Sequence, residues 1–356
     1  MSFTAPLIIT DGNAGLTAVS IIRDRANSKT ERQHCSVIRS QSAKMANMGE
    51  PVLPSAASDQ KYVTVSPMAG GFITLSDHHF VHPAEPGAKR TVPSLAFLIE
   101  HPGIKVFGHD PSKPFRMMFD RGLRKSKERY PEKLQKHIDD REPYELSPGI
   151  AAQLKSGGLD SKEIDLVMLS HVHYDHHGDP EDFPNAKFKV GAGALDVLKK
   201  GLGEIAPHQH FVPDTLPTDG RSSELSDPAT SEEWKPLGPF PAALDLFGDA
   251  SVFVIDTPGH LPGHINLLCR TKDRWIMLCG DAFHDRRLLT GEKVIGTWQG
   301  PEGNRLCIHL NEPEAVESIK RLREFEQDPF DKVELVAAHE EGWWERNKHF
   351  AFPKTL

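Results

Sequence analysis

The stretch His171-Val-His-Tyr-Asp-His-His-Gly-Asp179 contains four histidines and two aspartates, and it follows an apolar run at residues 164–170. The apolar run predicts a buried strand, so the polar stretch begins where a strand ends. His171 and His173 are two residues apart, and on an extended segment their side chains point to one face. Neutral imidazoles and carboxylates are the ligands that suit zinc and related metals. The stretch therefore predicts a metal site rather than a solvated polar loop.

Three other predicted strands, at residues 252–256, 275–279 and 333–338, also end in candidate ligands. The first runs into TPGHLPGH at residues 257–264, the second into Gly-Asp-Ala at 280–282, and the third into His339. Functional groups gather where strands end, because a rigid sheet holds them in place. Seven ligands for two ions are expected: His171, His173 and His264 on one ion, Asp175, His176 and His339 on the other, and Asp281 as the bridge. One histidine per loop is sufficient, so His260 is interpreted as a supporting or turn residue.

The order HxHxDH, TPGHxxGH, GDA and a final histidine resembles the metallo-β-lactamase superfamily from about Lys61 onward. The resemblance implies an α/β fold, a four-layer αββα sandwich with the ligands at strand ends. It also singles out Asp120 in the segment Phe119-Asp-Arg-Gly122, where an aspartate commonly accepts a hydrogen bond from the ligand loop. An ordinary turn is the alternative interpretation of that segment.

The expected chemistry follows from two cations about 3.5–4 Å apart, which hold a hydroxide and polarise a carbonyl oxygen. The hydroxide would attack an ester, thioester or lactone, and Asp175 would pass the proton to the leaving oxygen. Two Zn²⁺ ions are the expected cofactors, although Mn²⁺, Fe²⁺ and Co²⁺ suit the same ligands. The expected partner is a small-molecule ester or lactone.

Within the superfamily, residues 169–176 and the GDA loop look most like the N-acyl homoserine lactone lactonases. In those enzymes a tyrosine three residues after the bridging aspartate helps to polarise the lactone carbonyl. His284 occupies that position here, and it is expected to donate the same hydrogen bond or, alternatively, only to pack. Phe283 and Trp298 are expected to form an apolar wall for an acyl chain.

Two other classes of function remain open at this point. An acyl-thioester hydrolase of the polyketide-associated or glyoxalase II-like kind would use the same hydroxide. A metal-binding module without turnover is the non-enzymatic alternative. The combination of Asp175, His176 and Asp281 argues against that module, because a structural zinc site needs only four closed ligands.

Composition narrows the remaining possibilities. The net charge of −8 argues against a nucleic-acid partner, because such proteins usually present a basic face. No apolar run approaches the ~18 residues that a membrane span needs. The four cysteines, at positions 35, 269, 279 and 307, form no disulfide framework, so a reducing, cytoplasmic location is expected. The oligomeric state is left open.

The first part of the chain differs in composition from the rest. Residues 1–55 are rich in Ser, Ala and Asn with weak periodicity, which predicts a poorly ordered extension ahead of a catalytic domain at 56–356. An organellar transit peptide is a weaker interpretation, because acidic residues interrupt the segment. Met45 or Met48 as the true start is a further alternative, which leaves open whether residues 1–44 belong to the mature protein.

Two segments have less regular patterns. Residues 201–247 carry seven prolines among Asp, Ser and Gly, which predicts a long loop forming part of the wall over the site. Residues 125–140 are strongly charged and predict a solvated helix or lid. By contrast, Asn311 is a plausible cap for a structural helix that runs through Glu326.

Overall fold

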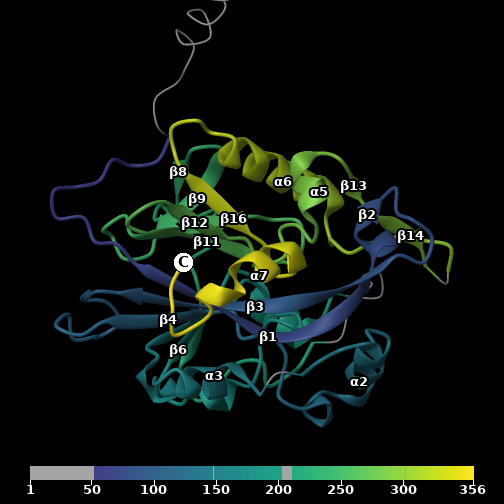
Figure 1. The fold of residues 1–356 in the computed structure, drawn as a ribbon, viewed down its shortest axis with the longest axis horizontal. Helices are drawn as coiled ribbons and strands as arrows, with labels where there is room; N and C mark the ends of the chain where they lie inside the picture. Colours follow the sequence, from purple (N-terminus) through teal and green to yellow (C-terminus); the bar gives the residue numbers. More distant parts are fainter. Residues whose placement is uncertain (1–51, 147, 203–210, 301) are drawn as a thin grey trace, which may run out of the picture. The chain divides into compact units, whose positions relative to one another are not determined.

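The computed structural model describes residues 52–146, 148–202, 211–300 and 302–356. Two six-stranded sheets lie face to face, and helices cover their outer faces (Figure 1). The predicted four-layer αββα architecture is confirmed. Residues 1–51 of the expected extension lie outside the described residues. Residues 52–55 of that extension are described, and Leu53 among them is buried, with its N–H donating to the Asp331 carboxylate at 3.0 Å.

The first sheet has the spatial order β1-β3-β4-β5-β6-β7. Its strands are β1 (Thr64–Ser76), β3 (Lys89–His101), β4 (Phe115–Phe119), β5 (Leu166–Met168), β6 (Lys187–Val190) and β7 (Ser222–Glu224). The second sheet has the order β16-β12-β11-β10-β9-β8. Its strands are β8 (Lys235–Leu237), β9 (Phe240–Asp245), β10 (Val252–Asp256), β11 (Ile265–Arg270), β12 (Trp275–Leu278) and β16 (Val333–Val336).

Short elements complete the fold. Two small antiparallel pairs are β2 (Val81–His82) with β13 (Val294–Ile295), and β14 (Thr297–Gln299) with β15 (Arg305–Cys307). The α-helices are α2 (Glu132–Asp139), α3 (Ile150–Ser156), α4 (Ala194–Lys200), α5 (Arg286–Thr290), α6 (Glu312–Glu326) and α7 (Glu341–Asn347). The 3-10 turns are η1 (Asp77–His79), η2 (Lys127–Arg129), η3 (Ser161–Glu163), η4 (Pro180–Asp182) and η5 (Lys348–Phe350).

Strand β10 shows how the layers are held together. Val252 and Val254 point into the apolar core between the two sheets, whereas Phe253 and Ile255 point to the core beneath α5 and α6. Successive side chains of a strand point to opposite faces, so a strand buried on both faces is apolar throughout. The continuous run Val-Phe-Val-Ile is therefore the pattern that a central strand of a four-layer fold requires.

The ligand-bearing strands deliver their loops to one edge of the sandwich. β4, β5 and β6 are parallel to one another, and β12 is parallel to β16. Two backbone hydrogen bonds join the sheets at this edge: the N–H of Ile265 donates to the Ser170 carbonyl, and the N–H of Leu95 donates to the Ala338 carbonyl, at 2.9 and 3.0 Å. The carboxyl ends of strands from both sheets therefore meet in one place.

The region at 201–247 differs from its prediction as a long loop, because its described part contains β7, β8 and β9. β9 pairs with β10, and β8 is the edge strand of that sheet. Pro236 is tolerated there because an edge strand need not donate every backbone N–H to a neighbour. Tertiary pairing thus outweighs the proline-rich composition. The pair His208 and His210 lies outside the described residues.

Two further differences concern element length. The expected helix at 125–140 is shortened to α2, which begins directly after Pro131, since proline favours a helix start and disrupts a helix interior. The sequence between residues 62 and 75 predicts two short strands, at 62–66 and 71–75, whereas the structure has one strand there, β1, with a register shift between Ala69 and Phe72. Within the described residues, no helix combines the length and apolar character needed to cross a membrane.

Candidate metal centre

The loop after β5 supplies the first group of ligand atoms. His171 Nε2 and His173 Nδ1 lie 2.9 Å apart. His260 Nε2 lies 3.1 Å from His173 Nδ1 and 3.5 Å from Asp281 Oδ2. The Asp281 Oδ2 atom is also 3.7 Å from His171 Nε2. Three imidazole nitrogens and one carboxylate oxygen therefore converge on one point, as a tetrahedral divalent-metal site requires.

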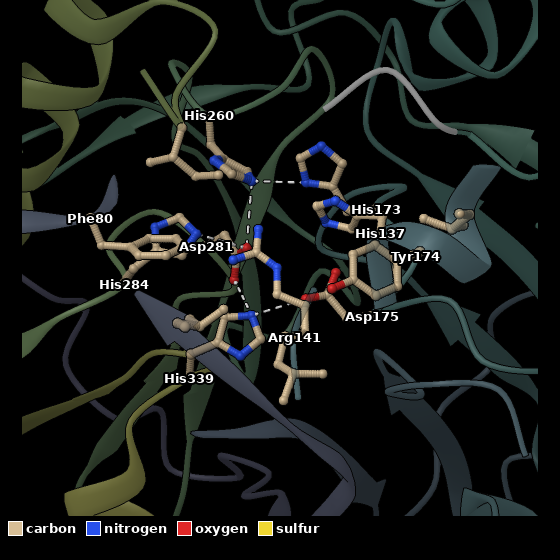
Figure 2. Close-up of a pocket in the computed structure, with 14 residues that line it drawn as sticks. Phe80, His137, Arg141, His173, Tyr174, Asp175, His260, Asp281, His284 and His339 are labelled. Carbon is tan, nitrogen blue, oxygen red and sulfur yellow. Dashed lines mark hydrogen bonds and ion pairs between the residues drawn. The ribbon is translucent and has the colours of Figure 1, made fainter. Parts of the chain in front are cut away.

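A second group lies beside the first and shares Asp281 with it. Asp281 Oδ1 lies 3.3 Å from His176 Nε2 and 3.4 Å from His339 Nε2. The Asp175 Oδ2 atom is 3.5 Å from the same nitrogen of His339. Figure 2 shows Asp281 between His260 on one side and His339 on the other, with Asp175 next to His339. One carboxylate thus faces both groups, each oxygen toward one of them.

The structure exchanges the expected roles of the two histidines in the TPGHLPGH segment. His264 Nδ1 donates to the Thr257 carbonyl at 3.1 Å, and its Nε2 accepts from the backbone N–H of Asp281 at 3.0 Å. Both ring nitrogens of His264 are thereby engaged, which leaves no lone pair for an ion. His260 stands in the first group instead. His264 orients the Asp281 loop, so the prediction of His264 as a ligand is corrected to His260.

Asp120 supports the ligand loop from the end of β4. Its carboxylate accepts hydrogen bonds from the N–H and Oγ of Ser170, both at 2.7 Å, and from His176 Nδ1 at 2.9 Å. A carboxylate on the far nitrogen fixes the tautomer of a histidine and turns its Nε2 lone pair toward the ion. Asp120 has a φ of 59°, a left-handed conformation that brings its side chain under the loop. On the other side, His339 Nδ1 donates to the Pro93 carbonyl at 2.8 Å.

The Gly280 backbone allows Asp281 to enter the site. Its φ is 48°, in the left-handed region. A Cβ atom at this position would lie 2.6 Å from the Ser170 Cβ and 3.0 Å from His264 Nε2. The glycine is therefore needed for both its conformation and the close approach of the two loops.

Burial and charge set the protonation states of the site. Burial holds the pKa of His171 and His260 well below the ordinary value and lowers the pKa of His173 to about 4. These imidazoles are neutral near pH 7, which is the form that binds metal. Burial alone would raise the pKa of Asp281, but neighbouring histidines, above all His176, hold it well below its usual range.

Several buried polar atoms lack the partners that a metal ion would supply. His176 Nε2 and Asp281 Oδ1 make no hydrogen bond with any described residue. Buried polar atoms are normally satisfied, so orphaned atoms that face one another require an explanation. A divalent cation between them satisfies both, because neutral imidazole and carboxylate are its ligands. The residues present therefore fit two divalent ions.

The two groups open into a cavity that encloses about 520 Å³, including its open mouth. Its apolar lining comes from β1, the end of η1, α2 and the segment before α6: Ile73, Leu75, Phe80, Leu134 and Ile308. The predicted wall residues do not line it. Phe283 is fully buried in the core beside α5 and α6, and Trp298 packs against His79 with ring centroids 4.5 Å apart. Strand β14 carries Trp298 away from the cavity.

His284 lies at the edge of the metal groups and lines the cavity. Its Nε2 is 3.1 Å from Asp281 Oδ2, and its Nδ1 makes no hydrogen bond with any described residue. The His309 ring is a further buried imidazole, with centroids 5.1 Å from His260 and 5.3 Å from His284. Sequence reasoning missed His309 and Arg141. His309 belongs to none of the sequence motifs. It lies in the segment between β15 and α6, and the folding of that segment against His260 and His284 brings it to the site.

Comparisons with known proteins agree with this fold. A sequence model described as the Metallo-beta-lactamase superfamily matches residues 138–324, more than half of the chain. "Gamma-lactamase FDB1" of Fusarium pseudograminearum is 31% identical over 62% of this chain and 48% of its own length. "Cytochrome P450 monooxygenase mpaDE" of Penicillium roqueforti is 28% identical over 82% of this chain. This chain spans 35% of the length of that protein.

Solved structures resemble the chain as well. A crystal structure described as a quorum-quenching N-acyl homoserine lactone lactonase aligns with a TM-score of 0.55 and 16% sequence identity. The alignment covers 85% of this chain and 100% of that one. Identity at this level establishes the shared fold and leaves the substrate to be argued from the site.

Proposed function

Because the chain belongs to the metallo-beta-lactamase superfamily, we propose that it is a metal-dependent hydrolase that opens a lactone, with an N-acyl homoserine lactone as the first candidate substrate. The observation that carries the proposal is the position of Asp281, whose two carboxylate oxygens face two separate groups of ligand atoms in one cavity. A structural site would be closed by four ligands, whereas this arrangement leaves room for a substrate.

His171, His173 and His260 would hold one ion, and Asp175, His176 and His339 the other, with Asp281 between them. Zinc is the proposed metal on the strength of its ligand preference, although iron, manganese and cobalt accept the same donors. When bound, two such ions supply an activated water and polarise a carbonyl. A substrate bound in the cavity would lie next to both groups.

Asp175 is the proposed proton carrier. It lines the cavity, and its Oδ2 lies 3.5 Å from His339 Nε2, within the second group. In lactone opening, the oxygen of water bonds to the carbonyl carbon and the ring carbon–oxygen bond breaks. Asp175 would receive the proton that the water loses and return it to the departing oxygen. His284 would donate a hydrogen bond to the substrate carbonyl from its place in the lining.

A γ-lactam is the second candidate substrate, and the similarity to FDB1, whose name describes a gamma-lactamase, favours it. The same attack on a ring carbonyl would break a carbon–nitrogen bond. Because an amide nitrogen leaves poorly unless it is protonated, that reaction would depend more strongly on Asp175.

A hydrolysis panel with the zinc-loaded protein tests the proposal. It compares N-hexanoyl homoserine lactone, a γ-lactam, an acyl thioester and an aryl ester, with the Asp175→Asn variant as the control. We expect lactone opening with kcat/KM above about 10⁴ M⁻¹s⁻¹ and a loss of at least about 100-fold in the variant. Thioester cleavage without lactone cleavage would contradict the substrate class. Equal activity of the variant would contradict the role of Asp175.

A further inference from the structure

Arg141 is a buried cation in the wall of the catalytic cavity. It follows α2, is only 8% exposed, and lines the cavity with His137 and Tyr174. Figure 2 shows its side chain among the labelled residues that surround the metal groups. The mechanism proposed above assigns it no task.

No carboxylate of the described residues lies within ion-pairing distance of the Arg141 guanidinium, and its Nε makes no hydrogen bond with them. The guanidinium interacts with the Tyr174 hydroxyl, which carries no charge to balance it. Other buried arginines are held by the protein itself. Arg124 pairs with Asp214 at 2.8 Å. Arg121 and Arg270 also have no carboxylate partner among the described residues, but they donate to the backbone carbonyls of Thr215 and Pro54, lie over aromatic rings and do not line the cavity. A guanidinium keeps its charge in proteins, and an unpaired buried charge is costly. A cation retained in this state beside a cavity indicates that the ligand supplies the counter-charge.

The backbone holds Arg141 in place. Its carbonyl accepts from the N–H of Thr74 on β1 at 2.9 Å, and its own N–H donates to the Ile138 carbonyl at 2.9 Å. The Thr74 hydroxyl also donates to the Pro143 carbonyl at 2.6 Å. Two of these hydrogen bonds attach the segment after α2 to β1, and the third links Arg141 to α2 itself. A binding group fixed before the ligand arrives loses less entropy on binding.

We propose that Arg141 forms an anion subsite, and that the natural substrate carries a carboxylate on the part of the molecule that is not cleaved. This inference rests on the proposed hydrolase function and refines its substrate class: an ester or lactone that carries a carboxylate would be preferred to the neutral N-acyl homoserine lactone. One planar guanidinium matches one carboxylate through two parallel hydrogen bonds. Among the described residues, the lining includes no lysine and no second arginine, so these residues would only partly neutralise a phosphate dianion. Ile73, Leu75 and Leu134 in the same lining are apolar and suit the carbon skeleton.

Matched substrates test the subsite. Para-acetoxybenzoate and para-acetoxybenzamide share the scissile acetyl ester and differ in the charge of the other substituent. With zinc-loaded enzyme we expect kcat/KM to favour the anionic ester by about 10- to 100-fold, after each rate is divided by its hydroxide-catalysed rate. Arg141→Met should raise KM for the anionic ester by at least about tenfold and leave the neutral ester nearly unchanged. Arg141→Lys keeps the positive charge but cannot form the two parallel hydrogen bonds, so its KM for the anionic ester should lie between those of the wild type and Arg141→Met.

A binding measurement separates this proposal from the proposed reaction. Titration calorimetry with benzoate and benzamide on the zinc-loaded protein should show tighter binding of benzoate, and Arg141→Met should remove that difference. If no ester is cleaved but benzoate binding still depends on Arg141, the hydrolase assignment fails and the subsite stands. Equal use of both esters by the wild type, or an equal fall in kcat for both in Arg141→Met, would overturn the subsite. Arg141→Lys provides the comparison if Arg141→Met does not fold.

Discussion

The two walls of the cavity are built in different ways. The metal-facing wall consists of loops that directly follow strands. Three residues or fewer separate the end of a strand from Asp120, His171, Asp281 and His339, and the other ligands of the first loop lie in the short motif at 171–176. The opposite wall combines β1, α2, Arg141 and Ile308, which lie far apart in the sequence. The first wall depends on covalent spacing, and the second depends on how the segments pack. We expect the first to control the reaction and the second to control substrate choice.

The largest expected effect comes from Asp281, which joins the two halves of the metal-facing wall. Asp281→Asn removes the negative charge that both groups share, so zinc content should fall from about two ions per chain to one or fewer. The value of kcat/KM should fall by at least about 10³-fold. Metal analysis by mass spectrometry and steady-state kinetics measure the two effects. A variant that retained two ions and full activity would contradict the bridging role.

The two histidines of the TPGHLPGH segment form a matched pair. His260→Ala should remove about one ion and lower kcat/KM by about 100-fold or more, because it deletes a ligand. His264→Ala should keep both ions and lower kcat/KM by about 10- to 100-fold, because it removes only the hydrogen bonds that support the Asp281 loop. Metal content and kinetics of the two variants, measured side by side, decide between them. The reverse order would restore His264 as the ligand.

A smaller effect is expected on the opposite wall. Ile308→Ala enlarges the apolar lining without touching a ligand, and it should raise KM for a long-chain acyl substrate by about tenfold with little change in kcat. Zinc content should stay at the wild-type value. Kinetics with short and long acyl chains provide the measurement. A fall in kcat with loss of metal would show that the two walls do not act separately.

The smallest effect concerns stability at the end of β10, away from both walls. Burial, together with the charges of Glu314 and Asp227, raises the pKa of Asp256 from 3.8 to about 6. The folded state therefore holds the proton more tightly than the unfolded state. Stability from this group is fully present below pH 3.8 and is lost as the pH rises to about 6.

Asp256→Asn avoids this loss. The variant should gain on the order of 2 kcal/mol in free energy of unfolding above pH 6 and less than about 1 kcal/mol near pH 4. Urea denaturation of both proteins at each pH measures the difference, since effects common to both cancel. A pH-independent difference would show that the raised pKa does not contribute to stability.

The sequence predicted the residues of the metal-facing wall with one exchange. Strand ends and the two-residue spacing in His171-Val-His173 depend on local geometry, which a sequence displays directly. Local geometry does not show whether His260 or His264 is the ligand, because both follow the same strand and each comes after a Pro-Gly pair. Only the hydrogen bond from the Asp281 N–H to His264 Nε2, across 17 residues, shows which ring is engaged.

The opposite wall shows where sequence reasoning ends. Phe283 and Trp298 are expected as wall residues because pockets are mostly apolar, but Phe283 packs in the core and Trp298 pairs with Leu306 in β14 and β15, outside the cavity lining. Arg141 directly follows the charged segment at 125–140, which has the pattern of a solvated helix, and only its hydrogen bond to β1 brings it to the cavity. The sequence by itself determined the fold, the ligand types and the class of reaction, because these follow from local patterns. The tertiary structure decided which histidine joins the other ligand atoms and which cation lines the cavity, because contacts between distant segments set both.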